Sequence, residues 1–270
     1  MPEKGNFAVL LRWWRAQRGL SQLALAGRAG ISQRHLSFLE LGRAQPSRDM
    51  VGQIADALDV PLRQQNVLLV AAGFAPEWRE TELGAPEFAA VNGALDYMMA
   101  QQEPYPAVVV DRHWNLLRAN NGAVRLVEFL VGPLAPSTKV NLADALVAPG
   151  VLKPFLTNWP EVVRYFIHSV EADAAADGTK EAAALLVRLR GYEGVREAVA
   201  RAPPPPSAPV LPMHFRKGNT SLKLFTTIAT LGTPRDITSQ ELRIESFFPS
   251  DIDTAEILRG WAVDQRSAKT

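Results

Sequence analysis

Residues 21–42 read SQLALAGRAGISQRHLSFLELG and predict two short helices joined by a tight turn. Ser21 and Ser32 each precede a helix-forming run and are suited to cap it. Gly30 can take the positive φ that ends the first helix. The pattern is that of a helix-turn-helix, whose second helix enters the DNA major groove.

The outward face of the second helix is set by its apolar periodicity. Leu36 and Leu39 fall on the inward side, so polar residues near the helix N-terminus face out. In the first helix, Leu23, Ala26 and Gly27 are expected to form a contact face of mostly small residues. The outward residues of the second helix are Gln33, Arg34, Ser37 and Phe38.

Three more helices are expected around this pair. One spans residues 7–17, one follows Ser47 and stops at residues 59–61, and the last runs to about residue 72. Five short helices in residues 1–74 predict a compact all-α bundle.

The charge is divided unevenly along the chain. Residues 1–74 carry nine basic and five acidic residues, or +4, whereas the remainder carries 20 basic and 23 acidic residues, or −3. A basic part joined to a mildly acidic one suits a nucleic-acid reader carrying a domain that does not touch DNA.

The bundle resembles the lambda-repressor-like, or XRE-family, DNA-binding domain over residues 7–74. The resemblance implies that Gln22 bonds a phosphate and that Arg43 touches the DNA backbone. It also implies that the outward residues of the second helix face base edges, and we add Ser32 at the start of that helix to the DNA-binding set. Glutamine can pair with adenine, arginine with guanine, and a phenylalanine ring can rest on thymine methyl groups. The matching residues are Arg15, Arg18-Gly19-Leu20-Ser21-Gln22, Leu25-Ala26, Ala29-Gly30-Ile31-Ser32, Leu36-Ser37, Glu40, Gly42-Arg43 and Pro46-Ser47.

Each contact has an alternative. Phe38 could instead cover the bundle surface, and Arg34 could be a solvated charge. Arg15 and Glu40 resemble DNA contacts, but the matching pair in this family is an internal salt bridge between the first and third helices. We take that structural interpretation for the pair.

Residues 75–87 predict a linker, and residues 88–270 a second domain. A helix over residues 88–101 precedes two strands, and several helices follow to about residue 202. Residues 203–206, with Pro209 and Pro212, form a proline spacer. Helix, two strands, helices and three strands is the order of a PAS-like α+β domain with a five-stranded antiparallel sheet. The strands are expected at residues 107–111, 114–119, 210–217, 221–231 and 242–248.

This second part resembles the MmyB-like ligand-binding domain over residues 88–258. The resemblance implies ligand-gated control of transcription, with a long-chain fatty acid as a reasonable ligand for an apolar PAS-like cavity. The segments that carry it are Pro106–Asp111, Trp114-Asn115, Ala119-Asn120, Phe225–Pro234, Leu242 and Ile244–Pro249.

Candidate ligand-binding residues in this domain are mostly apolar. Core packing is the alternative for the aromatic and methionine residues, and an exposed sheet edge is the alternative for His214 and Arg216, which could hold an anionic head group. The candidates are Met98, Met99, Trp114, Phe155, Trp159, Phe166, His214, Arg216, Phe225 and Thr227.

Other classes of protein are disfavoured. The chain has no cysteine, no apolar run of about 20 residues and no signal-type apolar segment, so we expect a cytoplasmic prokaryotic protein rather than a secreted or membrane one. Nucleophile-elbow, phosphate-loop and HExxH motifs are absent, and the four histidines are scattered. We therefore expect no enzyme, metal or cofactor.

Two functions remain open from the sequence. The first is a homodimeric transcription regulator that reads a double-stranded DNA operator and responds to a small apolar ligand. The second is a constitutive DNA-binding factor whose C-terminal domain serves only dimerisation or protein interaction.

Overall fold

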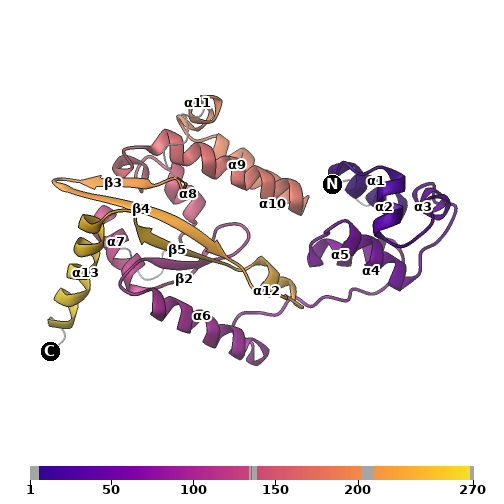
Figure 1. Ribbon diagram of the computed structural model, residues 1–270, viewed down its shortest axis with the longest axis horizontal. Coiled ribbons are helices and arrows are strands. Elements are labelled where there is room, and N and C mark those ends of the chain that lie inside the picture. The colour runs from indigo at the N-terminus through magenta and orange to yellow at the C-terminus, as the bar shows by residue number, and fades with distance from the viewer. Residues whose placement is uncertain (1–5, 134, 136–138, 202–208, 268–270) are drawn as a thin grey trace. The chain divides into compact units, whose positions relative to one another are not determined.

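The computed structural model describes residues 6–133, 135, 139–201 and 209–267, and divides into two compact units (Figure 1). The first unit contains the N-terminal helices up to Thr81, together with the segments Glu171–Ala183 and Thr233–Gln240. The second unit contains the sheet and the helices around it. The expected proline spacer at residues 203–206 lies outside the described residues.

Five helices form the N-terminal bundle: α1 (Phe7–Gln17), α2 (Gln22–Arg28), α3 (Gln33–Glu40), α4 (Arg48–Ala57) and α5 (Leu62–Ala71). Ser21, Ser32 and Ser47 each accept a backbone N–H of the third residue that follows, and so cap α2, α3 and α4. Gly30, between α2 and α3, has a φ of 67°. These caps and this turn confirm the predicted helix-turn-helix.

The bundle core differs from expectation in α2. Leu23 is 66% exposed and Gly27 is exposed too. Ala26 faces the core as expected, and Leu25 joins it there against Trp14, Leu36 and the inner residues of α4 and α5. The predictions for Leu23 and Gly27 were wrong because α2 has only seven residues, too few for periodicity to separate two apolar faces. Leu25 occupies the inward position, and none of its side chain is exposed.

The segment after α5 is tied to the bundle as far as Thr81. The Asn66 side chain accepts the backbone N–H of Trp78 and donates to its carbonyl, and the Trp78 indole donates to Gln65 at 2.8 Å. Within the same unit, Leu62 N–H donates to the Gln240 side chain at 2.8 Å. The first part of the expected linker therefore packs as structure on α5.

The second unit begins with a 3₁₀ turn (Pro86–Phe88) and places helices between and around five strands. α9, α10 and the short α12 also contribute residues to the first unit. α12 lies between the fourth and fifth strands in the chain and was not expected from the sequence. The elements are α6 (Ala89–Gln102), β1 (Ala107–Val110), β2 (Leu116–Ala119), α7 (Asn121–Val131), α8 (Leu142–Val147), a 3₁₀ turn (Lys153–Phe155), α9 (Trp159–Asp177), α10 (Lys180–Arg190), α11 (Val195–Ala200), β3 (Met213–Lys217), β4 (Thr220–Ala229), α12 (Ile237–Glu241), β5 (Arg243–Pro249) and α13 (Ile252–Ser267).

The strands form one antiparallel sheet in the order β2-β1-β5-β4-β3. The central strand β5 pairs with β1 through Val108 and Glu245, and with β4 through Ile228 and Glu245. The α+β class and the five-stranded antiparallel sheet expected from the sequence are confirmed, and the order of elements differs by the insertion of α12 before the fifth strand.

The two faces of the sheet are covered differently (Figure 1). α6 covers one face, where Leu95 and Met99 pack with Val109 and Ile244 in a small apolar cluster. Residues of β1, β3 and β4 on the opposite face share a larger core with α7, α8 and α9. Among the described residues, no helix combines the length and the apolar character needed to cross a membrane.

Candidate functional site

The outward side of α3 is the candidate nucleic-acid interface. Leu36 and Leu39 are fully buried, which fixes the rotation of the helix. Gln33 and Arg34 are exposed, whereas Ser37 and Phe38 are half-buried on the side of α3 away from the core. Ser32 is exposed and its hydroxyl accepts the N–H of His35 at 3.1 Å, so it begins the helix.

Glu40 at the end of α3 holds the bundle together from within. Its carboxylate accepts from Arg15 Nε at 2.6 Å and Arg15 Nη2 at 3.0 Å, and it is only 3% exposed. This confirms the internal salt bridge expected from the sequence. The hydrogen bond to Glu40 raises the pKa of Arg15, against the opposing effect of burial.

The same carboxylate also orients Gln22. Gln22 Nε2 donates to Glu40 Oε2 at 2.7 Å, so the half-buried side chain at the start of α2 is held in one position. An amide nitrogen carries two hydrogens. The second hydrogen of Gln22 therefore stays available for a phosphate oxygen, as the family resemblance implies.

Arg34, which is exposed, and Phe38, which is half-buried, form one outward-facing surface on α3. The guanidinium lies 5.4 Å from the ring centroid, one helical turn away, in cation–π geometry. Arg43 is exposed in the loop that follows the helix. The surface thus offers a planar donor, a glutamine amide and an aromatic ring side by side, which are the groups that read base edges in the major groove.

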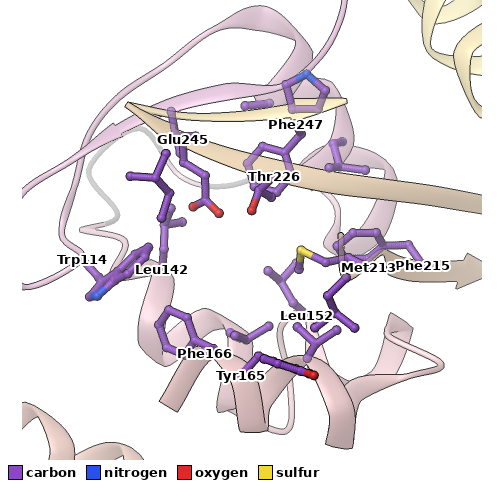
Figure 2. Close-up of a pocket in the computed structure, with 18 of the residues that line it drawn as sticks. Trp114, Leu142, Leu152, Tyr165, Phe166, Met213, Phe215, Thr226, Glu245 and Phe247 are labelled. Atoms are coloured by element: carbon purple, nitrogen blue, oxygen red, sulfur yellow. The ribbon is translucent and has the colours of Figure 1, made fainter. Parts of the chain in front are cut away.

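The second unit contains a largely apolar cavity of about 380 Å³ between the sheet and α7, α8 and α9 (Figure 2). This volume lies within the range of about 300–1,000 Å³ typical of small-molecule pockets. Aromatic rings from four parts of the domain line it: Trp114, Tyr165, Phe166, Phe215 and Phe247.

Trp114 reaches the cavity through a turn between β1 and β2. It has a positive φ of 67°, a region that costs about 1–2 kcal/mol for a residue with a side chain. The Asp111 carboxylate holds this turn by accepting the backbone N–H groups of His113 at 2.8 Å and Asn115 at 2.9 Å. The turn brings the indole against Phe166, with the ring centroids 4.8 Å apart.

Glu245 and Thr226 supply polar atoms to the cavity wall. Figure 2 shows the oxygens of both side chains pointing into the cavity. Burial raises the pKa of Glu245 to about 7, while a hydrogen bond from Thr226 and the charge of Arg243 act in the opposite direction. At neutral pH this carboxyl is therefore close to its midpoint between the neutral and the charged form.

Two of the ten predicted ligand residues, Trp114 and Phe166, line the cavity. The structure places the other eight elsewhere. Met99 is part of α6 and packs against the opposite face of the sheet, and Phe225 stacks on Phe248 on that face. Trp159 packs in the core and donates its indole N–H to the Leu146 carbonyl at 2.8 Å.

The remaining five candidates also lie outside the cavity lining. Met98 is 40% exposed on α6, and Phe155 is partly buried against the domain core. His214 is half-buried on the edge strand β3, while Arg216 and Thr227 are exposed on β3 and β4.

Sequence reasoning missed the polar pair of the cavity. Thr226 and Thr227 are both in an apolar run of β4, so alternation gave no reason to prefer one face over the other. Glu245 was visible as a single acidic residue inside the apolar run of β5. An isolated carboxylate in a central strand is the signal that would have found it, because acidic residues are uncommon in the middle of an apolar strand.

The outward face of α3 defines the first unit as a helix-turn-helix DNA-binding module, and the cavity defines the second as a small-molecule-binding α+β domain. Residues 11–65 match the helix-turn-helix family model, and residues 91–260 match the MmyB-like transcription regulator ligand binding domain. The second match covers more than half of the chain. The protein belongs to the family of transcription regulators with an MmyB-like ligand-binding domain.

The chain is similar to the solved structure of an RNA-binding light-oxygen-voltage receptor, at 13% sequence identity and a TM-score of 0.31. That alignment covers 97% of this chain and 58% of the receptor chain, and at this TM-score it carries no argument about fold or function. No curated protein matches the chain.

Proposed function

We propose that the protein is a DNA-binding transcription regulator whose operator affinity responds to a small, largely apolar, fatty-acid-like molecule in the cavity of its second unit. The observation that carries the proposal is the cavity itself, lined by aromatic and aliphatic side chains in a chain that also has a helix-turn-helix. A domain used only for dimerisation has no need of such a cavity. The proposal assigns the protein to the cytoplasm, where the DNA of a prokaryotic cell lies, and includes no catalytic step.

In the proposed complex, α3 lies in the major groove. Gln33, Arg34, Ser37 and Phe38 contact base edges, and Gln22, Ser32 and Arg43 lie at the backbone. This assignment is supported by the exposure of Arg34 and by the rotation that the buried Leu36 and Leu39 impose on the helix.

The regulator is proposed to act as a homodimer on an operator with approximate two-fold symmetry. Helix-turn-helix dimers read half-sites whose centres are about 34 Å, or one helical turn, apart. Ligand binding would then change the relative placement of the two α3 helices. Sedimentation of the free protein and of its operator complex tests the dimer.

The function is tested by comparing two variants of the full chain. Met213 lines the cavity from the edge strand β3, and Met98 is exposed on α6 outside it. Met213→Trp should fill the cavity and abolish the response of operator binding to an apolar ligand, with basal DNA affinity kept. Met98→Trp is the matched control and should retain the response.

Operators are first selected from random DNA, and affinity is then measured by fluorescence anisotropy with and without ligands found by native mass spectrometry of the purified protein. If no apolar compound binds and none alters operator affinity, the gating function is wrong. The constitutive DNA-binding factor is then the better description.

A further inference from the structure

The side chains of Thr226 and Glu245 lie next to each other on the sheet wall of the cavity. Ile228 pairs with Glu245 across β4 and β5, and Thr226 pairs with Phe247, so Thr226 and Glu245 are diagonal neighbours on the same face of the sheet. The Thr226 hydroxyl donates a hydrogen bond to the carboxyl of Glu245, which favours its charged form. Both groups point into the cavity (Figure 2).

The surroundings of Glu245 are otherwise apolar. Its direct neighbours on the adjacent strands are Val108 on β1 and Ile228 on β4. Across the cavity, α9 contributes Phe166 together with the polar side chains of Tyr165 and Ser169. None of the described residues that line the cavity is lysine, arginine or histidine, and Glu245 is the one carboxylic acid among them.

Arg243 is the charged group that acts on Glu245 from the same strand. It is not one of the lining residues, and its guanidinium lies 5.5 Å from the centroid of the Trp114 ring. A ligand carboxylate in the cavity would therefore face the Glu245 carboxyl, and no cation is among the described residues that line the cavity. Two carboxylates that share one site disfavour joint ionisation.

We propose that the cavity selects an apolar molecule whose polar end is uncharged and donates a hydrogen bond to Glu245, as an alcohol does, and that it discriminates against the carboxylate of the same chain length. The proposal rests on the proposed ligand-binding function and defines the head group of that ligand. A fatty acid meets this requirement only as the protonated acid. A carboxyl near the midpoint of its titration accepts a hydrogen bond when ionised and donates one when neutral, and a hydroxyl group satisfies both forms.

The test uses three probes with the same hydrocarbon chain: 1-decanol, decyl methyl ether and decanoate. Their affinities for the full chain are measured by isothermal titration calorimetry at about pH 8, where Glu245 is mostly ionised. Decanol donates a hydrogen bond, the ether only accepts one, and decanoate carries a negative charge. Decanol should bind about tenfold or more tightly than either, since it alone of the three offers the carboxylate a hydrogen bond without adding a negative charge.

Two variants isolate the role of Glu245. Glu245→Gln keeps the shape but presents an amide that can also donate, so the preference for decanol should fall to about threefold or less. Ser246→Ala is the matched control, because Ser246 is the next residue on β5 and faces the opposite side of the sheet. It should keep the full preference, and circular dichroism checks that both variants fold.

The outcomes separate the inference from the function on which it rests. Equal binding of all three probes, tighter binding of decanoate, or an unchanged preference in Glu245→Gln overturns the inference alone. If none of the three probes binds the folded wild-type chain, the inference and the proposed apolar-ligand function fail together.

Discussion

The Glu40 carboxylate is held by Arg15 through two hydrogen bonds of 2.6 and 3.0 Å, which tie the recognition helix α3 to α1. Its second oxygen also accepts from Gln22 at 2.7 Å, so one buried acid connects α1, α2 and α3. The spacing of the two helices that would meet DNA therefore depends on a group that does not itself face outward.

Glu40→Ala should destabilise the bundle by about 3–5 kcal/mol, because it leaves the Arg15 charge without its buried partner. Urea unfolding followed by circular dichroism measures this. Glu77→Ala is the matched control, since Glu77 pairs with Arg48 at 3.3 Å in an exposed contact whose loss should cost less than about 1 kcal/mol. Equal losses in the two variants would contradict a structural role for the Arg15–Glu40 pair.

Arg34→Ala should weaken binding to the selected operator by about 1–3 kcal/mol and relax specificity at one base pair. The reason is that its guanidinium, stacked on Phe38, is preorganised on the outward face of α3. Competition binding against single-base operator variants tests this, with Arg12→Ala on the exposed side of α1 as the control. If affinity for operator and random DNA fell equally, Arg34 would be a phosphate contact.

Glu245 should make stability depend on pH. Its pKa is about 7 in the folded protein against 4.5 for the ordinary group, so the folded state holds more protons than the unfolded state between these values. Stability is therefore fully present below about pH 4.5, is lost as the pH rises toward 7, and stays reduced above it, by up to about 3 kcal/mol.

Glu245→Gln removes this titration. The free energy of unfolding of Glu245→Gln minus that of wild type should therefore increase as the pH is raised from about 4.5 to 8. Urea unfolding at a series of pH values measures this difference. Thr226→Val removes the hydrogen bond that lowers the pKa of Glu245, and should move the loss of stability to higher pH. Parallel profiles for wild type and Glu245→Gln would show that Glu245 titrates normally.

Gly122→Ala should destabilise the second unit, because an added Cβ would lie 2.6 Å from the Pro104 carbonyl oxygen and 2.7 Å from that of Tyr105. Overpacking of this kind costs about 1–3 kcal/mol or more when the neighbour is backbone. Gly93→Ala is the matched control in α6, where nothing lies within 4 Å of the new methyl group. Thermal unfolding should show Gly93→Ala gaining about 0.5–1 kcal/mol, and a stable Gly122→Ala would mean that the start of α7 can shift.

The sequence by itself determined the helical bundle and the order of the second unit. Caps such as Ser32, the positive φ at Gly30 and the pairing of Arg15 with Glu40 depend on residues a few positions apart or on a family pattern, so they could be predicted before the structure. The five strands were found for the same reason, since apolar runs bounded by turn residues are local signals.

Only the tertiary structure decided which residues meet in the cavity. Both faces of β4 are largely apolar, and it is the pairing of β4 with β5 that turns Thr226 inward while Thr227 stays on the opposite face. The same pairing brings Glu245 beside Thr226, and the left-handed turn at Trp114 brings its indole against Phe166. These neighbours lie 19 and 52 positions apart in the chain, a separation at which periodicity carries no information, so contact between them is fixed by sheet register and helix packing alone.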